Sequence, residues 1–201
     1  MKNRSTEEVF KKKAPSLLSP LEAFLYWEKE NPNHLFLQQP INGKLIKYTY
    51  GEAGKELRKV ALKLQSLGLE KKSHIALLSK NCAHWMMTDM AIMMSGYVSV
   101  PLYPNLNAAS LEKILNHSEA KLLFVGKLDD YAIMKPGVPA DLPCITFPFY
   151  SEDYPKWNDV TKDIAPIQEN IIREAQDLAT IIYTSGTTGD PKGVMHKFFN
   201  F

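Results

Sequence analysis

The sequence predicts an α/β fold, a layered and mainly parallel sheet flanked by helices with a hairpin beside it. Three short and nearly continuous apolar segments, 74–78, 97–103 and 121–125, alternate with two segments that have helical apolar spacing. Strands that are apolar on both faces are typical of a parallel sheet covered by helices. The connections between these strands are therefore expected to be right-handed crossovers.

The composition is that of an ordinary globular chain. Among its 201 residues, 45% are hydrophobic and 23% are charged, which excludes collagen-like, coiled-coil and wholly disordered classes. The formal net charge of +2 gives no reason to expect a nucleic-acid partner. Two cysteines are too few for a disulfide scaffold, and no segment reads as a signal peptide or a transmembrane helix. We expect a soluble, cytoplasmic protein, with peripheral membrane contact left open.

Two helices in the N-terminal third have clear start signals. Ser19-Pro-Leu-Glu22 and Thr49-Tyr-Gly-Glu52 each combine a capping hydroxyl with an acid three residues later. The first helix is predicted to run to about Glu30, ahead of a proline. The second is predicted to end at Gly68, which suits a left-handed C-terminal position.

Further signals place the remaining elements of the first 125 residues. Asn42-Gly43 lies between two apolar runs and predicts a hairpin. Asn81 and Asn107 are predicted to cap the two helices between the apolar strands. Residues 1–17 are predicted to form a polar tail ahead of one domain that spans 18–201.

The second half of the chain loses this rhythm and then ends on a strand. Residues 127–176 hold six of the 13 prolines, so we predict an irregular connection with one or two short elements. Residues 178–183 form an apolar, buried-looking strand that leads directly into Thr184.

The segment after this strand, Thr184-Ser-Gly-Thr-Thr-Gly-Asp-Pro-Lys192, has the composition of a phosphate-binding loop. Its two glycines allow positive φ and close backbone approach, and successive amides in such a turn form an anion-binding nest. Its hydroxyls add neutral donors, and its lysine adds a charge suited to phosphate. Open α/β sheets bind ligands at the ends of their strands. The candidate residues are Thr184, Ser185, Gly186, Thr187, Thr188, Gly189 and Lys192.

The loop differs from the two standard nucleotide-binding motifs. Pro191 precedes Lys192 where G-x-x-x-x-G-K-[ST] requires glycine, and Gly193 follows where it requires serine or threonine. The pattern G-x-G-x-x-G is also not met. A flexible Gly/Thr hairpin turn without a ligand is the structural alternative.

The run 184–193 resembles the signature loop of the adenylate-forming, AMP-binding superfamily. Residues 49–52, Asn81 and 96–104 resemble the N-terminal half of the large domain in long-chain fatty-acid–CoA ligases, so the resemblance covers about residues 18–201. It implies that a carboxylic acid attacks the α-phosphate of Mg²⁺-bound ATP, giving an acyl-adenylate and pyrophosphate. The thiol of coenzyme A then takes the acyl group and releases AMP. The seven candidate residues would hold the β- and γ-phosphates, and this chain's acid would be a long-chain fatty acid.

The sequence departs from that family in two ways. Many relatives have an acyl-pocket histidine at the position of Phe198; His196 lies two residues earlier, so no catalytic residue is assigned. A phenylalanine there would suit an apolar acyl chain. The adenine pocket, the acidic Mg²⁺ ligand, the ribose-binding aspartate and the catalytic lysine would lie beyond residue 201. We therefore expect an N-terminal portion that is inactive alone; a non-catalytic ATP- or polyphosphate-binding module and a non-functional truncated product are the alternatives.

Other groups of residues are expected to be structural. Five methionines between 86 and 94 share one predicted helix and are expected to pack in the core, although a soft acyl-binding surface is an alternative. The five histidines show no metal-ligand spacing, and no G-x-S-x-G motif supports hydrolase chemistry. A sheet cut at residue 201 is expected to leave an uncovered edge and apolar face, which favours association.

Overall fold

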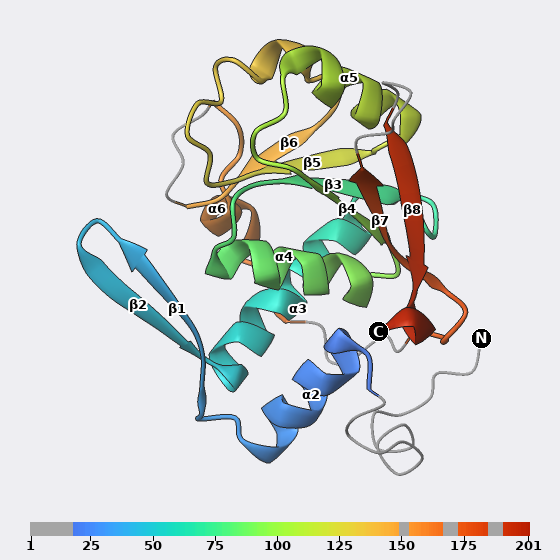
Figure 1. Cartoon of the computed structure of the whole chain (residues 1–201). Coiled ribbons are helices and arrows are strands. Elements are labelled where there is room, and N and C mark those ends of the chain that lie inside the picture. The colour runs from blue at the N-terminus through green and yellow to red at the C-terminus, as the bar shows by residue number, and fades with distance from the viewer. Residues whose placement is uncertain (1–17, 149–152, 167–172, 185–190) are drawn as a thin grey trace.

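The computed structural model describes residues 18–148, 153–166, 173–184 and 191–201 (Figure 1). The predicted polar tail, 1–17, lies outside these ranges. Within them, no helix is long and apolar enough to cross a bilayer.

A six-stranded sheet forms the centre of the molecule (Figure 1). Its strands lie in the order β6-β5-β3-β4-β7-β8, and all neighbours are parallel except β7 and β8, which are antiparallel. The bounds are β3 His74–Leu78, β4 Val98–Leu102, β5 Leu122–Val125, β6 Cys144–Thr146, β7 Leu178–Thr184 and β8 Lys192–Lys197. The layered, mainly parallel α/β sheet is therefore confirmed, and its central strands are almost wholly buried.

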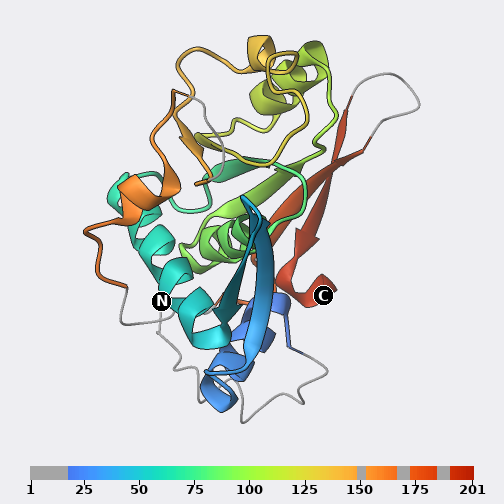
Figure 2. The ribbon, with the colours of Figure 1, turned by 90° about the vertical axis from the view of Figure 1, so that its left-hand side faces the viewer.

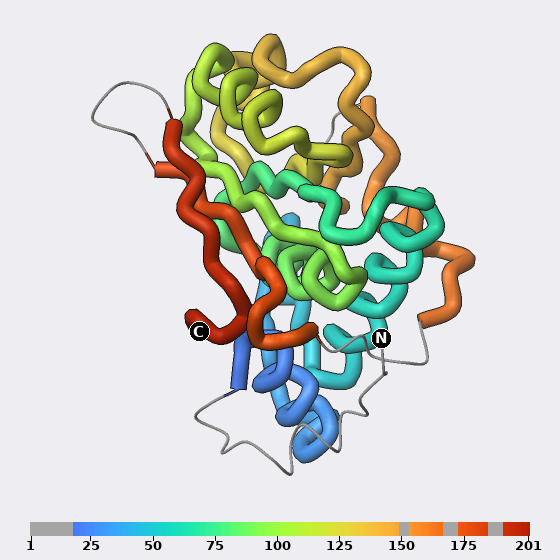
Figure 3. Tube along the Cα trace, turned by 90° about the vertical axis from the view of Figure 1, so that its right-hand side faces the viewer, coloured from blue at the N-terminus to red at the C-terminus, as the bar shows by residue number. Residues whose placement is uncertain are grey.

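Helices cover both faces of this sheet (Figures 1 and 3). One core cluster packs α2, α3, α4 and α6 against one face, and a second packs α5 and the short helix η2 against the other. The bounds are α2 Pro20–Glu30, α3 Tyr50–Ser66, α4 Ala83–Met94, α5 Ala108–His117, η2 Lys135–Gly137 and α6 Trp157–Thr161. The chain crosses from β3 to β4 through α4 and from β4 to β5 through α5, so the two crossovers lie on opposite faces.

The N-terminal signals form as the sequence predicts. Both capping boxes are present, with the Ser19 and Thr49 amides each donating to the acid three residues on at 2.8 Å. Strands β1 (Leu35–Ile41) and β2 (Lys44–Thr49) form a separate antiparallel hairpin beside the sheet (Figure 2). Its turn residues, Asn42 and Gly43, have φ of 49° and 74°, the left-handed values that a tight hairpin turn requires.

The start of α4 differs from the prediction. Its N-cap is Cys82, whose Sγ accepts a hydrogen bond from the Trp85 amide at 3.4 Å, so the capping role predicted for Asn81 is wrong. Asn81 is exposed one residue earlier. Most of the α4 methionines are fully or nearly fully buried, which confirms their role in the core.

Two strands were not predicted, and each joins an edge of the sheet. The three-residue β6 lies in the irregular connection, which also contains η2 and α6, so the connection holds three short elements rather than the one or two predicted. Strand β8 has the sequence Lys-Gly-Val-Met-His-Lys, which lacks the apolar alternation of a half-buried strand. It forms because β7 offers it an edge, and its residues stay largely exposed, Met195 at 68%. The expected association through such an edge stays a prediction.

A half-buried acid on α4, Asp89, supplies a stability prediction. Burial raises the pKa of the Asp89 carboxyl to about 6, and the nearby Ser99 hydroxyl offsets this only in part. A raised pKa means that the charged form destabilises the folded state above pH 6, and that this cost disappears as the pH falls toward 4.

We therefore expect Asp89→Asn to raise the free energy of unfolding by about 2–3 kcal/mol at pH 7 and by well under about 1 kcal/mol at pH 4. Urea unfolding of both proteins across this range measures the difference. The buried His84, whose pKa burial lowers to about 4, is common to both proteins and cancels in the comparison. An equal difference at both pH values would contradict the burial of a charged Asp89.

Candidate functional site

The predicted phosphate loop joins the far ends of β7 and β8. Thr184, the last residue of β7, pairs with Lys192, the first residue of β8, and both are exposed. The hydroxyl and the lysine at the two ends of the predicted loop are thus held side by side by the strand ladder. The other candidates, Ser185, Gly186, Thr187, Thr188 and Gly189, lie outside the described residues.

Tyr183, the residue before Thr184, is held in place by a contact with helix α5. The Tyr183 side chain is 3% exposed, and its hydroxyl lies 2.7 Å from Nδ1 of His117 at the end of α5. Its pairing partner on β8 is Gly193, where a Cβ would come within 2.8 Å of the Ile181 side chain and 3.2 Å of the Tyr183 ring. Glycine after Lys192 therefore lets β8 pack closely over this ring and keeps the lysine opposite Thr184.

A crevice of about 530 Å³ opens at the carboxyl ends of the parallel strands. It is lined by 79–81 after β3, by 101–104 at the end of β4, by Lys127 after β5, and by Trp85 and Ile182. Because the crossovers from β3 and β4 run to opposite faces, this is the point of an open α/β sheet at which ligands typically bind. The crevice and the loop belong to the same edge, since Ile182 lies two residues before Thr184.

Positive charge gathers at the mouth of this crevice. Lys80 and Lys127 lie in adjoining loops that are tied together, with the Lys80 amide donating to the Lys127 carbonyl at 2.7 Å and the Lys127 amide donating to the Ser79 hydroxyl at 2.8 Å. Lys80 is also ion-paired with Asp129. The preceding Gly126 is required here, because a Cβ would meet the Phe147 ring at 2.3 Å. Two lysines thus line the crevice, one of them paired with an acid, and this basic lining suits an anionic ligand.

Sequence reasoning did not find this crevice. Its lining comes from segments that lie far apart in the chain, and only the strand order brings them together. The signal that could have found it is the reversal of strand order around β3, with β4 added on one side of β3 and β5 on the other, which follows once the two crossovers are assigned to opposite faces.

A second hollow of about 390 Å³ lies between β2, α3, α4 and α6. It is lined by Tyr48, Glu56, His84 and Trp157 among others, and burial lowers the pKa of His84 to about 4. His84 therefore stays neutral at physiological pH. Among the described residues, no cluster of three His, Cys, Asp or Glu could hold a metal ion.

The structure also places Phe198 and His196, the two residues discussed where the sequence departs from the family's histidine pattern. Phe198, in the short helix η3 (Phe198–Asn200), is 5% exposed in the core and lies under the Arg173 guanidinium, 5.2 Å from it. It lines neither of the two hollows described here, and its suggested place in an acyl pocket stays a prediction. His196 is partly buried, and its ring lies 6.4 Å from that of Phe201.

The family model for AMP-binding enzymes matches residues 24–201, nearly all of the described sequence. The chain belongs to the AMP-binding enzyme family. Two relatives have names that specify long-chain acids. The long-chain-fatty-acid–CoA ligase FadD15 of Mycobacterium bovis is 31% identical over 174 residues, which are 83% of this chain and 29% of the relative. Long chain acyl-CoA synthetase 2 of Arabidopsis thaliana is 29% identical over 197 residues, 88% of this chain and 30% of the relative.

Other relatives differ in their named acid. The 4-coumarate–CoA ligase 1 of Solanum tuberosum is 31% identical over 157 residues, 75% of this chain and 28% of the relative. The solved structure of the anthranilate CoA ligase AuaEII with anthranoyl-AMP has the same fold, with a TM-score of 0.74 at 21% identity over 94% of this chain and 37% of that chain. This AMP-binding chain thus spans less than a third of the length of the curated relatives it matches.

Proposed function

We propose that this chain contributes the triphosphate-binding part of an ATP-dependent acid–thiol ligase that forms an acyl-adenylate. The observation that carries the proposal is the pairing of Thr184 with Lys192 at the two ends of a Gly/Thr-rich loop, at the ligand-binding edge of the sheet. Membership of the AMP-binding family supports it. ATP is then a substrate of the protein, together with a carboxylic acid and coenzyme A.

The described residues fit a triphosphate in their donor chemistry. Thr184 offers a neutral hydroxyl, and Lys192 offers an ammonium that is exposed and free to turn toward the loop. With Ser185, Gly186, Thr187, Thr188 and Gly189, they would hold the β- and γ-phosphates. When an acid attacks the α-phosphate, negative charge grows on the departing pyrophosphate, and Lys192 with the loop amides would stabilise it.

Mg²⁺ would accompany the nucleotide and neutralise part of its charge when bound. The described residues do not supply a cluster of metal ligands, so the ion would be held mainly by the phosphates and by groups outside them. The contribution proposed for this chain is to bind and orient the phosphates.

Long-chain fatty acids are the acids that we propose for the whole ligase. Support comes from two of the relatives, whose names specify long-chain fatty acids or long-chain acyl groups. The likeness to a 4-coumarate–CoA ligase makes aromatic acids the class to compare with them.

The 201-residue chain is expected to show no ATP–pyrophosphate exchange by itself, because it spans about 29% of the relative's length. Exchange of labelled pyrophosphate into ATP, with palmitate or 4-coumarate present, measures this, and an intact long-chain ligase serves as the control. A rate near that of the intact relative would contradict the proposal that the chain is only a part of the catalytic unit. Binding of ATP without exchange is the result that we expect.

A further inference from the structure

An arginine at the base of the β7–β8 hairpin contacts four separate parts of the chain. The Arg173 side chain is 5% exposed, and its Nη1 donates to the Tyr97 carbonyl at 2.9 Å and to the Met93 carbonyl at 3.2 Å. Its Nη2 donates to the Leu178 carbonyl at 3.3 Å, at the first residue of β7. Met93 lies in the last turn of α4, where the helix dipole favours a cation.

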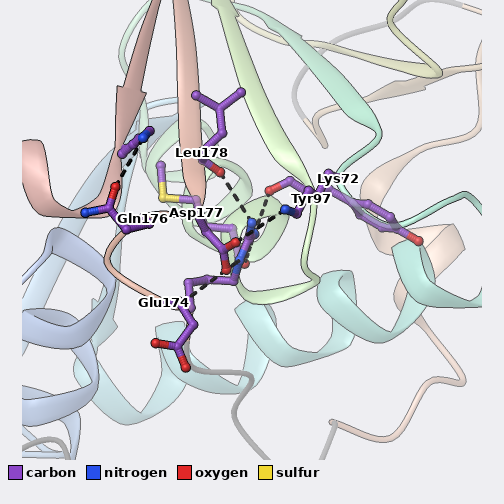
Figure 4. A network of polar contacts seen from close by, with 9 residues as sticks. Lys72, Tyr97, Glu174, Gln176, Asp177 and Leu178 are labelled. Carbon is purple, nitrogen blue, oxygen red and sulfur yellow. Dashed lines mark hydrogen bonds and ion pairs between the residues drawn. The ribbon is translucent and has the colours of Figure 1, made fainter. Parts of the chain in front are cut away.

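The turn that follows Arg173 is locked to the same guanidinium (Figure 4). The Asp177 carboxylate accepts from Arg173 Nε at 3.3 Å and from the Glu174 amide at 3.2 Å, and it lies 3.6 Å from Lys72 Nζ. Partial burial opposes ionisation of Asp177, but the Glu174 amide and the Arg173 charge keep the pKa of its carboxyl below the usual value. The carboxylate therefore stays charged and paired at neutral pH.

The strand that leaves the hairpin is tied to this turn as well. The Phe198 amide donates to the Asp177 carbonyl at 3.1 Å, and the Phe199 amide donates to the Ala175 carbonyl at 3.0 Å. Arg173 also lies over the Phe198 ring. The entry to β7 and the exit from β8 are thus joined at one point, and that point is attached to α4 and β4.

At its far end the hairpin has a second attachment, the Tyr183–His117 contact to α5. Between these two ends, β7 spans six residue steps, or about 20 Å. Strand β7 pairs in parallel with β4 at Ser99 and Thr180, where the Thr180 hydroxyl also donates to the Ser99 carbonyl at 3.0 Å. Over that length, a tilt of about 10° about the base would move Thr184 by about 3 Å.

We propose that Arg173 at the base and Tyr183 at the tip are the positioning residues of the phosphate loop, holding the β7–β8 hairpin so that Thr184 and Lys192 face the ligand. This inference rests on the proposed function of the loop. Neither residue contacts the ligand; each acts by fixing the strands that carry the loop.

Two matched pairs of variants test this role. Arg173→Met removes the guanidinium, and Arg58→Met is its control, because Arg58 makes a bidentate pair with Glu28 at 2.6 Å between α3 and α2. Tyr183→Phe removes one hydroxyl, and Tyr97→Phe is its control, because the Tyr97 hydroxyl donates to the Leu64 and Leu69 carbonyls at 3.4 Å. Arg173→Lys keeps the positive charge but loses the planar set of guanidinium donors. It replaces Arg173→Met in the test if that variant does not fold.

Each variant is measured by Tm, by amide hydrogen exchange, and by the Kd for inorganic tripolyphosphate. We expect Arg173→Met to speed exchange in β7 and β8 by about tenfold relative to β3 and to raise the Kd by about tenfold. Tyr183→Phe should act in the same direction but more weakly, and Arg173→Lys should fall between Arg173→Met and wild type. The two control variants should lower Tm while leaving the Kd within about twofold.

The possible outcomes separate this inference from the proposed function. If amide exchange in β7 and β8 is unchanged in Arg173→Met, Arg173 does not hold the hairpin, whatever the Kd shows. Faster exchange with an unchanged Kd would overturn the positioning role, and so would equal losses of affinity in the control variants. If wild type does not bind tripolyphosphate, the proposed function fails and the positioning role falls with it, whereas the exchange data still decide whether Arg173 holds the hairpin.

Discussion

Lys192→Ala is expected to raise the Kd for ATP and for tripolyphosphate by about 10- to 100-fold, because a hydrogen bond to a charged group contributes roughly 1.5–3 kcal/mol. Affinity for AMP should change little, since AMP lacks the β- and γ-phosphates that the lysine would contact. Titration calorimetry of the chain with each of the three ligands measures these effects. The loss should also be smaller at high salt, where the attraction between exposed charges is screened.

Lys197→Ala is the matched control for this variant. Lys197 ends the same strand, is also exposed, and donates to Gln176 at 3.1 Å at the base of the hairpin. Its removal changes the net charge equally, so a general electrostatic effect would weaken binding in both variants. Equal losses for ATP and AMP in Lys192→Ala, or equal losses in the two lysine variants, would contradict the assigned role.

Trp157→Ala is expected to lower the free energy of unfolding by about 3–5 kcal/mol, the usual cost of truncating a buried aromatic side chain. Trp157 is 1% exposed on α6, and its ring packs against His84 at 5.2 Å and Phe147 at 5.9 Å. Its indole nitrogen lies 3.5 Å from a Glu56 carboxylate oxygen on α3. The tryptophan therefore joins the irregular second half of the chain to the helices on one face of the sheet.

Trp27→Ala provides the comparison for this stability prediction. Trp27 lies on α2 and is 45% exposed, so its removal should cost about 1 kcal/mol or less. Urea unfolding followed by circular dichroism measures both variants. A loss in Trp157→Ala no larger than that in Trp27→Ala would show that α6 is not part of the cooperative core.

The sequence predicted the elements whose signals are local. Apolar runs on both faces identified β3, β4 and β5, and the capping boxes at Ser19 and Thr49 placed two helix starts. Their patterns depend on burial and on hydrogen bonds within a few residues, which a sequence displays directly. The phosphate loop also depends on a local signal, and it stays a prediction because the structure describes only its two ends.

The features that were missed depend on contacts between distant segments. Strand β8 exists because β7 offers an edge, and its own residues carry little strand signal. Arg173 donates to the carbonyls of Met93, Tyr97 and Leu178. Because every residue has a backbone carbonyl, the identities of these residues do not reveal the contact. The crevice likewise needs the strand order before its lining can be known.

The most direct test is a nitrogen–proton correlation spectrum of the ¹⁵N-labelled chain, recorded while tripolyphosphate is added. Saturable shifts at the amides of 184–190 and 192, with little change in the β1–β2 hairpin on the other side of the molecule (Figure 1), are the expected result. If those amides do not shift at saturating ligand, or if shifts appear only at other lysine-rich surfaces, the triphosphate-binding role on which the proposed function depends is contradicted.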